Sequence, residues 1–221
     1  TTIFVRKGTY KEKLIVPECK INISLIGEDG TVIAGNGYAN KLNVFGEPMS
    51  TYGSATCYIY APDFYAENIA IENNAGMVGE AVAAFVGGDR DMFKHCRFSS
   101  FQNTLYTYGS NNRQYYEDCY IEGSVDFITG QGEAVFNGCE LRSRKQGSVT
   151  AAGTDQDQKY GYIYYECKLT ADAGTTDVCL GRPLRPTAKC VFIRCNMGSH
   201  IDLLGWNEWS KPAAEKQSFF A

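Results

Sequence analysis

The sequence of 221 residues has little of what several common kinds of site require. It contains two histidines, and we interpret His95 as an ordinary strand residue, so a serine–histidine–carboxylate triad has little to draw on. The lack of a CxxC pair argues against a zinc site, and the lack of a dense carboxylate cluster argues against calcium. No apolar run approaches the roughly 18 residues of a membrane-spanning helix. The net charge of -4 argues against nucleic acid as a partner.

Glycine and tyrosine are plentiful, with 23 and 15 residues, whereas proline has six. This composition favours many short strands joined by tight turns over helices. The length and a hydrophobic fraction of 44% predict one domain over residues 1–221 with a large core. Residues 1–5 read as a strand and the chain ends abruptly at Ala221, so we expect a piece of a longer protein.

Five of the nine cysteines lie in one repeated local frame. The frame is an aromatic residue, two variable residues, Cys, a mostly polar residue and a large apolar residue. Its copies are 93–98 (FKHCRF), 116–121 (YEDCYI), 136–141 (FNGCEL), 164–169 (YYECKL) and 192–197 (FIRCNM). The cysteines recur at intervals of 23, 20, 28 and 28 residues. An earlier, less regular copy over 64–71 places Asn68 where the others have Cys.

Repeats of this length are typical of solenoids and related arrays. Each unit contains short strand patterns and turn residues without an amphipathic helix, which predicts an all-β, single-stranded parallel β-helix with one coil per repeat. Equivalent residues would then stack, and small thiols suit an interior ladder. A disulfide framework is the alternative, although a domain of this size needs no such cross-links. One or two disulfides among the other cysteines remain open.

Four chemically notable clusters are separated by near multiples of this repeat. Asp126 lies between Val125 and Phe127, and a carboxylate among apolar neighbours is costly unless a cation or donors meet it. Intervals of 22, 24 and 56 residues separate Glu80 from Gln102, Gln102 from Asp126, and Asp126 from Arg182. These are near one, one and two coils, so we expect all four clusters, including Asn103, on one face.

Each residue also has a purely structural interpretation. Glu80 alone fits a solvated strand end, and Gln102 with Asn103 fits a turn or an amide ladder. Asp126 with Arg182 fits a structural buried ion pair. Their expected convergence on one face favours a functional site.

The chain resembles the pectin methylesterase (pectinesterase) family, which has a right-handed parallel β-helix. The resemblance runs in the same order over essentially the whole chain, and its motifs are specific. The matching segments are 8–12 (GTYKE), 79–85 (GEAVAAF), 88–90 (GDR), 102–105 (QNTL), 123–128 (GSVDFI), 180–183 (LGRP) and 205–209 (GWNEW). The family begins about one coil earlier and has a C-terminal extension, so the resemblance implies an incomplete β-helix.

The resemblance implies hydrolysis of the C6 methyl esters of polygalacturonate, giving pectate and methanol. Asp126 matches the nucleophile, and Arg182 hydrogen-bonds that carboxylate and keeps it ionised. Gln102 matches a donor of the oxyanion hole. Asn103 stands where the family has an aspartic acid that protonates methanol and then activates water. Glu80 stands where the family has a glutamine that supports the oxyanion.

These departures leave two interpretations. In the first, Glu80 has taken over proton transfer from the position of Asn103, which conserves two site carboxylates. In the second, the site is degenerate, because an amide cannot transfer the proton and Leu184 replaces a tryptophan that would contact sugar. Thr129 also replaces a usual phenylalanine. Loss of general acid–base catalysis costs about 10²–10⁴-fold in rate.

We expect Phe101, Phe127 and Trp206 to contact sugar rings together with Leu184, although each ring would also suit the core. The expected partner is pectin or homogalacturonan, with no nucleic acid, membrane, cofactor or metal. We expect a secreted or periplasmic monomer, since the substrate lies outside cells. A polysaccharide lyase on the same architecture and a non-catalytic carbohydrate-binding module are the alternatives.

Overall fold

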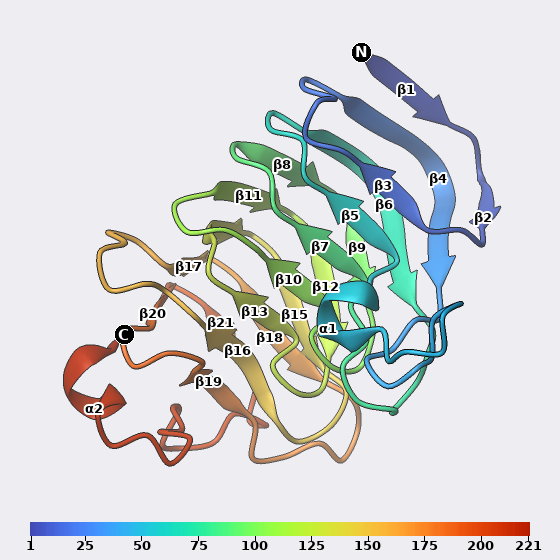
Figure 1. Cartoon of the computed structure of the whole chain (residues 1–221). Helices are drawn as coiled ribbons and strands as arrows, with labels where there is room; N and C mark the ends of the chain where they lie inside the picture. Colours follow the sequence, from blue (N-terminus) through green and yellow to red (C-terminus); the bar gives the residue numbers. More distant parts are fainter.

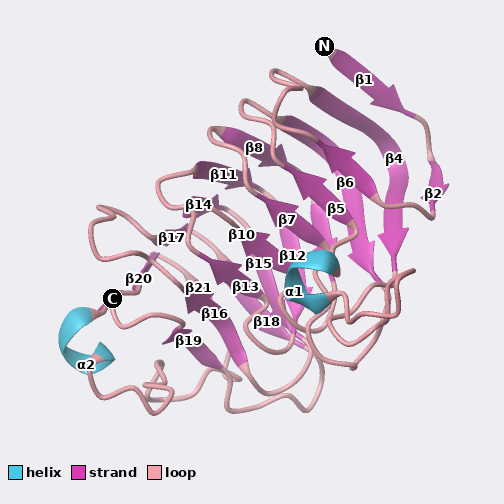
Figure 2. Cartoon of the chain, viewed as in Figure 1, coloured by secondary structure: helices cyan, strands magenta, loops and turns pink.

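The computed structural model describes residues 1–221, and its strands stack as successive turns of a coil (Figure 1). Every pairing between two of its strands is parallel. Each turn of the coil passes through a sheet of seven strands and then through two wings of a sheet of 15 strands. Strands and loops make up nearly the whole chain (Figure 2). The predicted right-handed parallel β-helix is confirmed.

The elements fall into four groups. The seven-stranded sheet contains β3 (Leu14–Val16), β5 (Cys57–Ile59), β7 (Ala84–Val86), β10 (Leu105–Thr107), β13 (Ile128–Gly130), β16 (Ser148–Ala152) and β19 (Cys179–Pro183). The larger sheet begins with β1 (Thr2–Val5), β2 (Gly8–Tyr10), β4 (Ser24–Gly35) and β6 (Tyr65–Asn73). Its first wing contains β8 (Asp91–Lys94), β11 (Arg113–Glu117), β14 (Glu133–Asn137), β17 (Tyr162–Tyr165), β20 (Lys189–Ile193) and β22 (Phe219–Phe220). Its second wing contains β9 (Arg97–Ser99), β12 (Tyr120–Gly123), β15 (Glu140–Ser143), β18 (Lys168–Ala171) and β21 (Asn196–Met197).

Two short helices, α1 (Ser50–Gly53) and α2 (Ala214–Gln217), lie outside the coil (Figure 1). Neither of them is long and apolar enough to cross a membrane. The termini lie at opposite ends of the stack, as the N and C marks in Figure 1 show.

The repeated aromatic positions form a ladder inside the coil. Adjacent rings are stacked nearly parallel, with centroids 4.3–5.0 Å apart, along Phe93, Tyr116, Phe136, Tyr164 and Phe192. Aromatic pairs at such separations add to the free energy gained by burial of their surface. The repeat seen in the sequence is therefore the register of the core.

The repeated cysteines form a second interior ladder of free thiols. From Cys119 onward, each thiol of the repeat donates a hydrogen bond to the backbone carbonyl of the aromatic residue one coil earlier. Cys119 donates to Phe93 at 3.4 Å, and Cys139 to Tyr116 at 3.4 Å. All nine cysteines are free. The prediction of stacked free thiols is confirmed, and the disulfide framework is excluded.

The earliest copy of the repeat is shifted by one residue from the prediction. Ala66 pairs with Phe93, so Ile69 occupies the position that Cys96 has in the next coil. Asn68 instead has a left-handed backbone with φ of 57°, like His95 before Cys96. Asparagine tolerates this conformation better than most residues. Asn68 is therefore the left-handed residue of the corner and is not part of the thiol ladder.

The seven-stranded sheet positions the candidate site. Leu105 and Ile128 are paired in register and face the core. Tyr106, the residue after Leu105, points to the outer face, where it pairs with Phe85 of the preceding strand. The segments just before these strands lie at one corner of the coil. That corner brings together residues from successive turns.

Candidate active site

The centre of the site is a close ion pair between Asp126 and Arg182. The Nε atom of Arg182 donates to Oδ1 of Asp126 at 2.8 Å, and its Nη2 donates to Oδ2 at 2.5 Å. The side chain of Asp126 is 8% exposed and that of Arg182 is 23% exposed. Such a bidentate pair fixes the plane of the carboxylate as well as its position. The pairing predicted from the coil spacing is therefore present.

The turn before β13 explains how Asp126 is held. Its backbone is left-handed, with φ of 48°, and its N–H donates to the carbonyl of Ser148 at 2.7 Å. A Cβ atom at Gly123 would overlap the Cβ atom of Phe127, so only glycine fits there. The segment 123–127 is thus a tight corner that turns the carboxylate of Asp126 toward Arg182, which lies two coils further along the chain.

Two effects oppose each other on this carboxylate. Burial raises the pKa of Asp126, while the hydrogen bonds and charge of Arg182, and the charge of Lys211, lower it. Burial is the larger effect, so the pKa of Asp126 lies above its ordinary value. A buried carboxylate beside a fixed cation is less hydrated than one in water, which favours it as a nucleophile.

Arg182 is itself held by a residue that the sequence analysis did not single out. Its guanidinium carbon lies 3.9 Å from the ring centroid of Trp209, and the Nζ atom of Lys211 lies 4.0 Å from the same centroid. Lys211 also donates to the carbonyls of Pro183 and Leu184, each at 2.9 Å. Trp209 belongs to the segment 205–209 that carries part of the family resemblance, and it is this second tryptophan, and not Trp206, that contacts the arginine.

Gln102 and Asn103 lie one coil before Asp126. Gln102 forms a parallel bridge with Val125, and the N–H of Asn103 donates to the carbonyl of Val125 at 3.3 Å. Asn103 stands two residues before Leu105, as Asp126 stands two residues before Ile128, and Leu105 pairs with Ile128. Both residues have a left-handed backbone. Asn103 therefore occupies the position equivalent to Asp126 one coil earlier. Its side chain is an amide, so the left-handed backbone of the corner is retained but the carboxylic acid is absent.

Glu80 lies one coil earlier again. The next residue, Ala81, donates its N–H to the carbonyl of Gln102 at 3.1 Å, so the two segments are adjacent. The side chain of Glu80 is half-buried and forms no hydrogen bond or ion pair. The corner thus brings together the backbones of all the predicted site segments, and Asp126 with Arg182 is the pair in direct contact.

The predicted sugar-contacting residues differ in their surroundings. Phe127 has no exposed surface and belongs to the core, so the prediction that its ring meets a sugar is wrong. The left-handed corner at Asp126 breaks the strand alternation, and both Phe127 and Ile128 point inward. One face of Phe101 is covered by the guanidinium of Arg144, at 3.8 Å.

Trp206 and Leu184 are half-buried, and their sugar contacts stay predictions. The ring of Trp206 stacks on Phe220, with centroids 4.6 Å apart, and lies against Phe192. One face of the Trp206 ring therefore packs on the aromatic residues of the last coil.

An aromatic cluster on the outer face of the same sheet was also missed. Tyr58, Phe85 and Tyr106 pair in register on β5, β7 and β10, and Phe85 stacks on Tyr106 with centroids 5.3 Å apart. Tyr52 from α1 lies over this row and its hydroxyl is 3.3 Å from that of Tyr106. The sequence signal for this cluster is that each of the three short strands has an aromatic residue, Tyr58, Phe85 or Tyr106, at the same strand position.

The comparisons with known proteins agree with this geometry. The family model named Pectinesterase matches residues 1–221. The chain belongs to the pectinesterase family. It is 35% identical to Pectinesterase 31 of Arabidopsis thaliana, over all of this chain and 71% of that protein. It spans about two fifths of several longer plant relatives.

Solved structures agree as well. Pectin methylesterase from carrot is 28% identical, with a TM-score of 0.91 over 99% of this chain and 71% of that one. A pectin methylesterase in complex with a hexasaccharide is 32% identical, with a TM-score of 0.86 over 91% of this chain and 71% of that one. The predicted family, and with it the class of carboxylic ester hydrolase acting on pectin, is confirmed.

Proposed function

We propose that this chain hydrolyses methyl esters of polygalacturonate with Asp126 as the nucleophile. The observation that carries the proposal is the bidentate contact of Arg182 with Asp126 at the corner where Gln102 and Asn103 lie. Arg182 and burial hold the carboxylate in one orientation, which lowers the cost of bringing it to the ester carbonyl. We also propose that the chain acts outside cells, since the polymer lies there, and that it does so as a monomer.

The reaction has two steps in this proposal. A carboxylate oxygen of Asp126 attacks the ester carbonyl carbon, the bond to the methoxy oxygen breaks, and the proton that makes methanol comes from a neighbouring acid. The amide of Gln102 donates to the oxyanion. Water then attacks the acyl group, the same neighbouring group accepts a proton, and Asp126 is released as a carboxylate.

We assign the proton transfer to Glu80. Asn103 cannot transfer the proton, because its amide does not ionise near neutral pH. The carboxylate of Glu80 is free of other partners and comes from the coil adjacent to Gln102 and Asn103. A carboxylate that is not engaged elsewhere is available to alternate between acid and base.

Methanol release from methylated pectin tests this assignment. We expect Glu80→Gln to lower the rate by about 10²–10⁴-fold and Asp126→Ala to abolish it. Asn103→Asp restores the family's acid and is the matched control for Glu80→Gln. If the unmodified chain releases no more methanol than Asp126→Ala while Asn103→Asp gains activity, the role of Glu80 is wrong.

A second candidate is a degenerate module that binds uronate chains without turnover, favoured by Asn103 and Leu184. Inactivity of every variant, together with saturable binding of pectin, would support it. Measuring the ultraviolet absorbance of unsaturated uronides in the same reactions tests for a lyase.

A further inference from the structure

Lys211 is bonded to the strand end that carries Arg182. Its Nζ atom donates to the carbonyl of Pro183 and to that of Leu184, each at 2.9 Å, at the end of β19. The same atom lies 4.0 Å from the ring centroid of Trp209. A lysine ammonium has three donors, so two carbonyls and one aromatic face occupy all of them. Lys211 thus joins the last loop of the site to β19.

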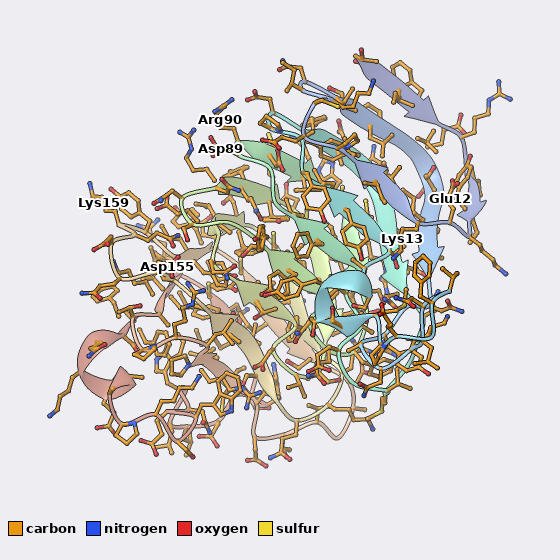
Figure 3. All side chains as sticks on the ribbon, in the orientation of Figure 1. Glu12, Lys13, Asp89, Arg90, Asp155 and Lys159 are labelled. Atoms are coloured by element: carbon orange, nitrogen blue, oxygen red, sulfur yellow. The ribbon has the colours of Figure 1, made fainter.

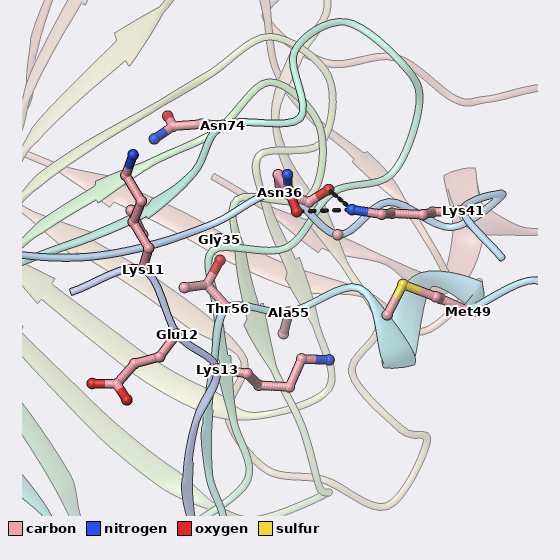
Figure 4. A pocket seen from close by; sticks show the side chains of 12 residues that line it. Lys11, Glu12, Lys13, Gly35, Asn36, Lys41, Met49, Ala55, Thr56 and Asn74 are labelled. Carbon is pink, nitrogen blue, oxygen red and sulfur yellow. Dashed lines mark hydrogen bonds between the residues drawn. The ribbon is translucent and has the colours of Figure 1, made fainter. Parts of the chain in front are cut away.

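Three other lysines are held less firmly than Lys211. In the cavity beside β3, Lys41 donates only to Asn36, and Lys11, which lines the same cavity, has no hydrogen bond (Figure 4). Lys159 lies at the rim of the molecule in Figure 3, and its ammonium meets only the ring of the next residue, 5.0 Å from the centroid. Lys211 differs from them because two backbone carbonyls and a ring fix its charge in one place.

The turn that leads into Lys211 has a strained backbone. The N–H of Lys211 donates to the carbonyl of Glu208 at 3.1 Å, which closes a four-residue turn. Both central residues, Trp209 and Ser210, have a φ of 52°. A type I′ turn has this left-handed pattern, which favours glycine and asparagine and disfavours a bulky residue. Such a turn persists only where its surroundings hold it, and the bonds of Lys211 to β19 do so.

The ring of Trp209 brings two cations close to the nucleophile. The guanidinium carbon of Arg182 lies 3.9 Å from the ring centroid, and the ammonium of Lys211 lies 4.0 Å from it. The charges of Arg182 and Lys211 both lower the pKa of Asp126, against the larger effect of burial. The loss of either charge would therefore make Asp126 harder to ionise.

The position of Lys211 has a cost in free energy. Burial, and next the charge of Arg182, lower the pKa of Lys211, so its charged form is disfavoured there. Lys211 forms no ion pair that would offset this cost. A charge that is kept at a cost beside a nucleophile indicates a role at the site.

We propose that Lys211 is a positioning residue for the reaction at Asp126. It holds the turn so that the ring of Trp209 stays on Arg182, and its fixed charge supports the ionised form of the nucleophile. This inference rests on the proposed function, because it takes Asp126 as the nucleophile.

Methanol release measured against pH tests the proposal. We expect Lys211→Met, which keeps the apolar stem, to lower kcat by about tenfold with little change in KM. It should also move the acid limb of the pH profile to higher pH. Lys211→Arg keeps the charge and the donors, so it should restore most of kcat and the limb. Lys216→Met is the matched control, because it removes an exposed lysine of α2, and it should behave like the unmodified chain.

A second variant covers the case in which Lys211→Met does not fold. Lys211→Gln keeps an amide donor for the carbonyls of β19 but carries no charge. We expect it to move the acid limb in the same direction as Lys211→Met.

The pKa of Asp126 can also be followed without activity, by NMR of isotope-labelled aspartate carboxyl groups. We expect Lys211→Met to raise it. If neither the acid limb nor this titration moves, the proposal is wrong, and Lys211 only holds the loop in place. If the unmodified chain releases no more methanol than Asp126→Ala while the titration still moves, the effect of Lys211 on the carboxylate stands and the proposed esterase activity is refuted.

Discussion

Asp126 and Asp91 are both buried carboxylates, but their surroundings differ. Asp126 has two hydrogen bonds from Arg182, whereas Asp91 is 1% exposed and accepts one bond, from the N–H of Phe64 at 3.1 Å. The second oxygen of Asp91 has no partner. Burial raises the pKa of Asp91 to about 7. Both carboxylates are buried, so it is the bidentate contact with Arg182, and not burial, that distinguishes Asp126 from Asp91.

The nearest arginine to Asp91 in sequence is already occupied. Arg90 is bonded to Asp63 and Asp89 on the surface. Asp91 thus lies beneath an ion-pair network without taking part in it. At neutral pH it is about half protonated, which suits a structural position and not a nucleophile.

The largest expected effect is the difference in kcat between variants of Asp126 and of Asp91. Asp126→Asn should lower kcat for methanol release by at least about 10³-fold, because the nucleophile is lost while the shape is kept. Asp91→Asn should leave kcat near that of the unmodified chain. Methanol release per folded protein, with folding checked by circular dichroism, measures both. A comparable loss in the two variants would mean that burial, and not the arginine pair, is what matters.

The second contrast is in stability against pH. The pKa of Asp91 is higher in the folded than in the unfolded chain, so its contribution is fully present below about pH 4 and is lost as the pH rises toward about 7. Relative to Asp91→Asn, the unmodified chain should lose roughly 2–4 kcal/mol of unfolding free energy between pH 4 and pH 8.

Urea unfolding of both proteins at the two pH values measures this difference. The amide introduced by Asp91→Asn keeps an oxygen that can accept from Phe64 and carries no charge, so the variant isolates the ionisation. Parallel pH dependences of the two proteins would show that Asp91 does not titrate with folding.

The sequence predicted the coil because buried ladders impose a repeat that is visible at Phe93, Cys96 and their equivalents. The same spacing predicted the contact of Asp126 with Arg182, two coils apart. It failed where the backbone leaves the strand pattern. The left-handed corner at Asp126 turned Phe127 inward, and Trp209 reaches Arg182 from an irregular segment that follows no repeat.

The smallest expected effect comes from Trp209, and it tests whether the position of Arg182 depends on this ring. Trp209 stacks on the guanidinium of Arg182, and such a contact is worth about 0.5–2 kcal/mol. Trp209→Leu should therefore lower kcat by up to about 2–30-fold with little change in KM, because Arg182 is held less firmly against Asp126.

The pH profile separates this role from simple packing. Asp126 must be ionised to attack, so activity falls as the pH drops through its pKa, which burial already raises and Arg182 holds down. A looser Arg182 in Trp209→Leu should move this acid limb to higher pH, whereas Trp209→Tyr keeps an aromatic face and should restore both kcat and the limb. If Trp209→Leu changes stability but leaves the limb in place, the ring only packs, and the arginine is aimed by the backbone of β19 alone.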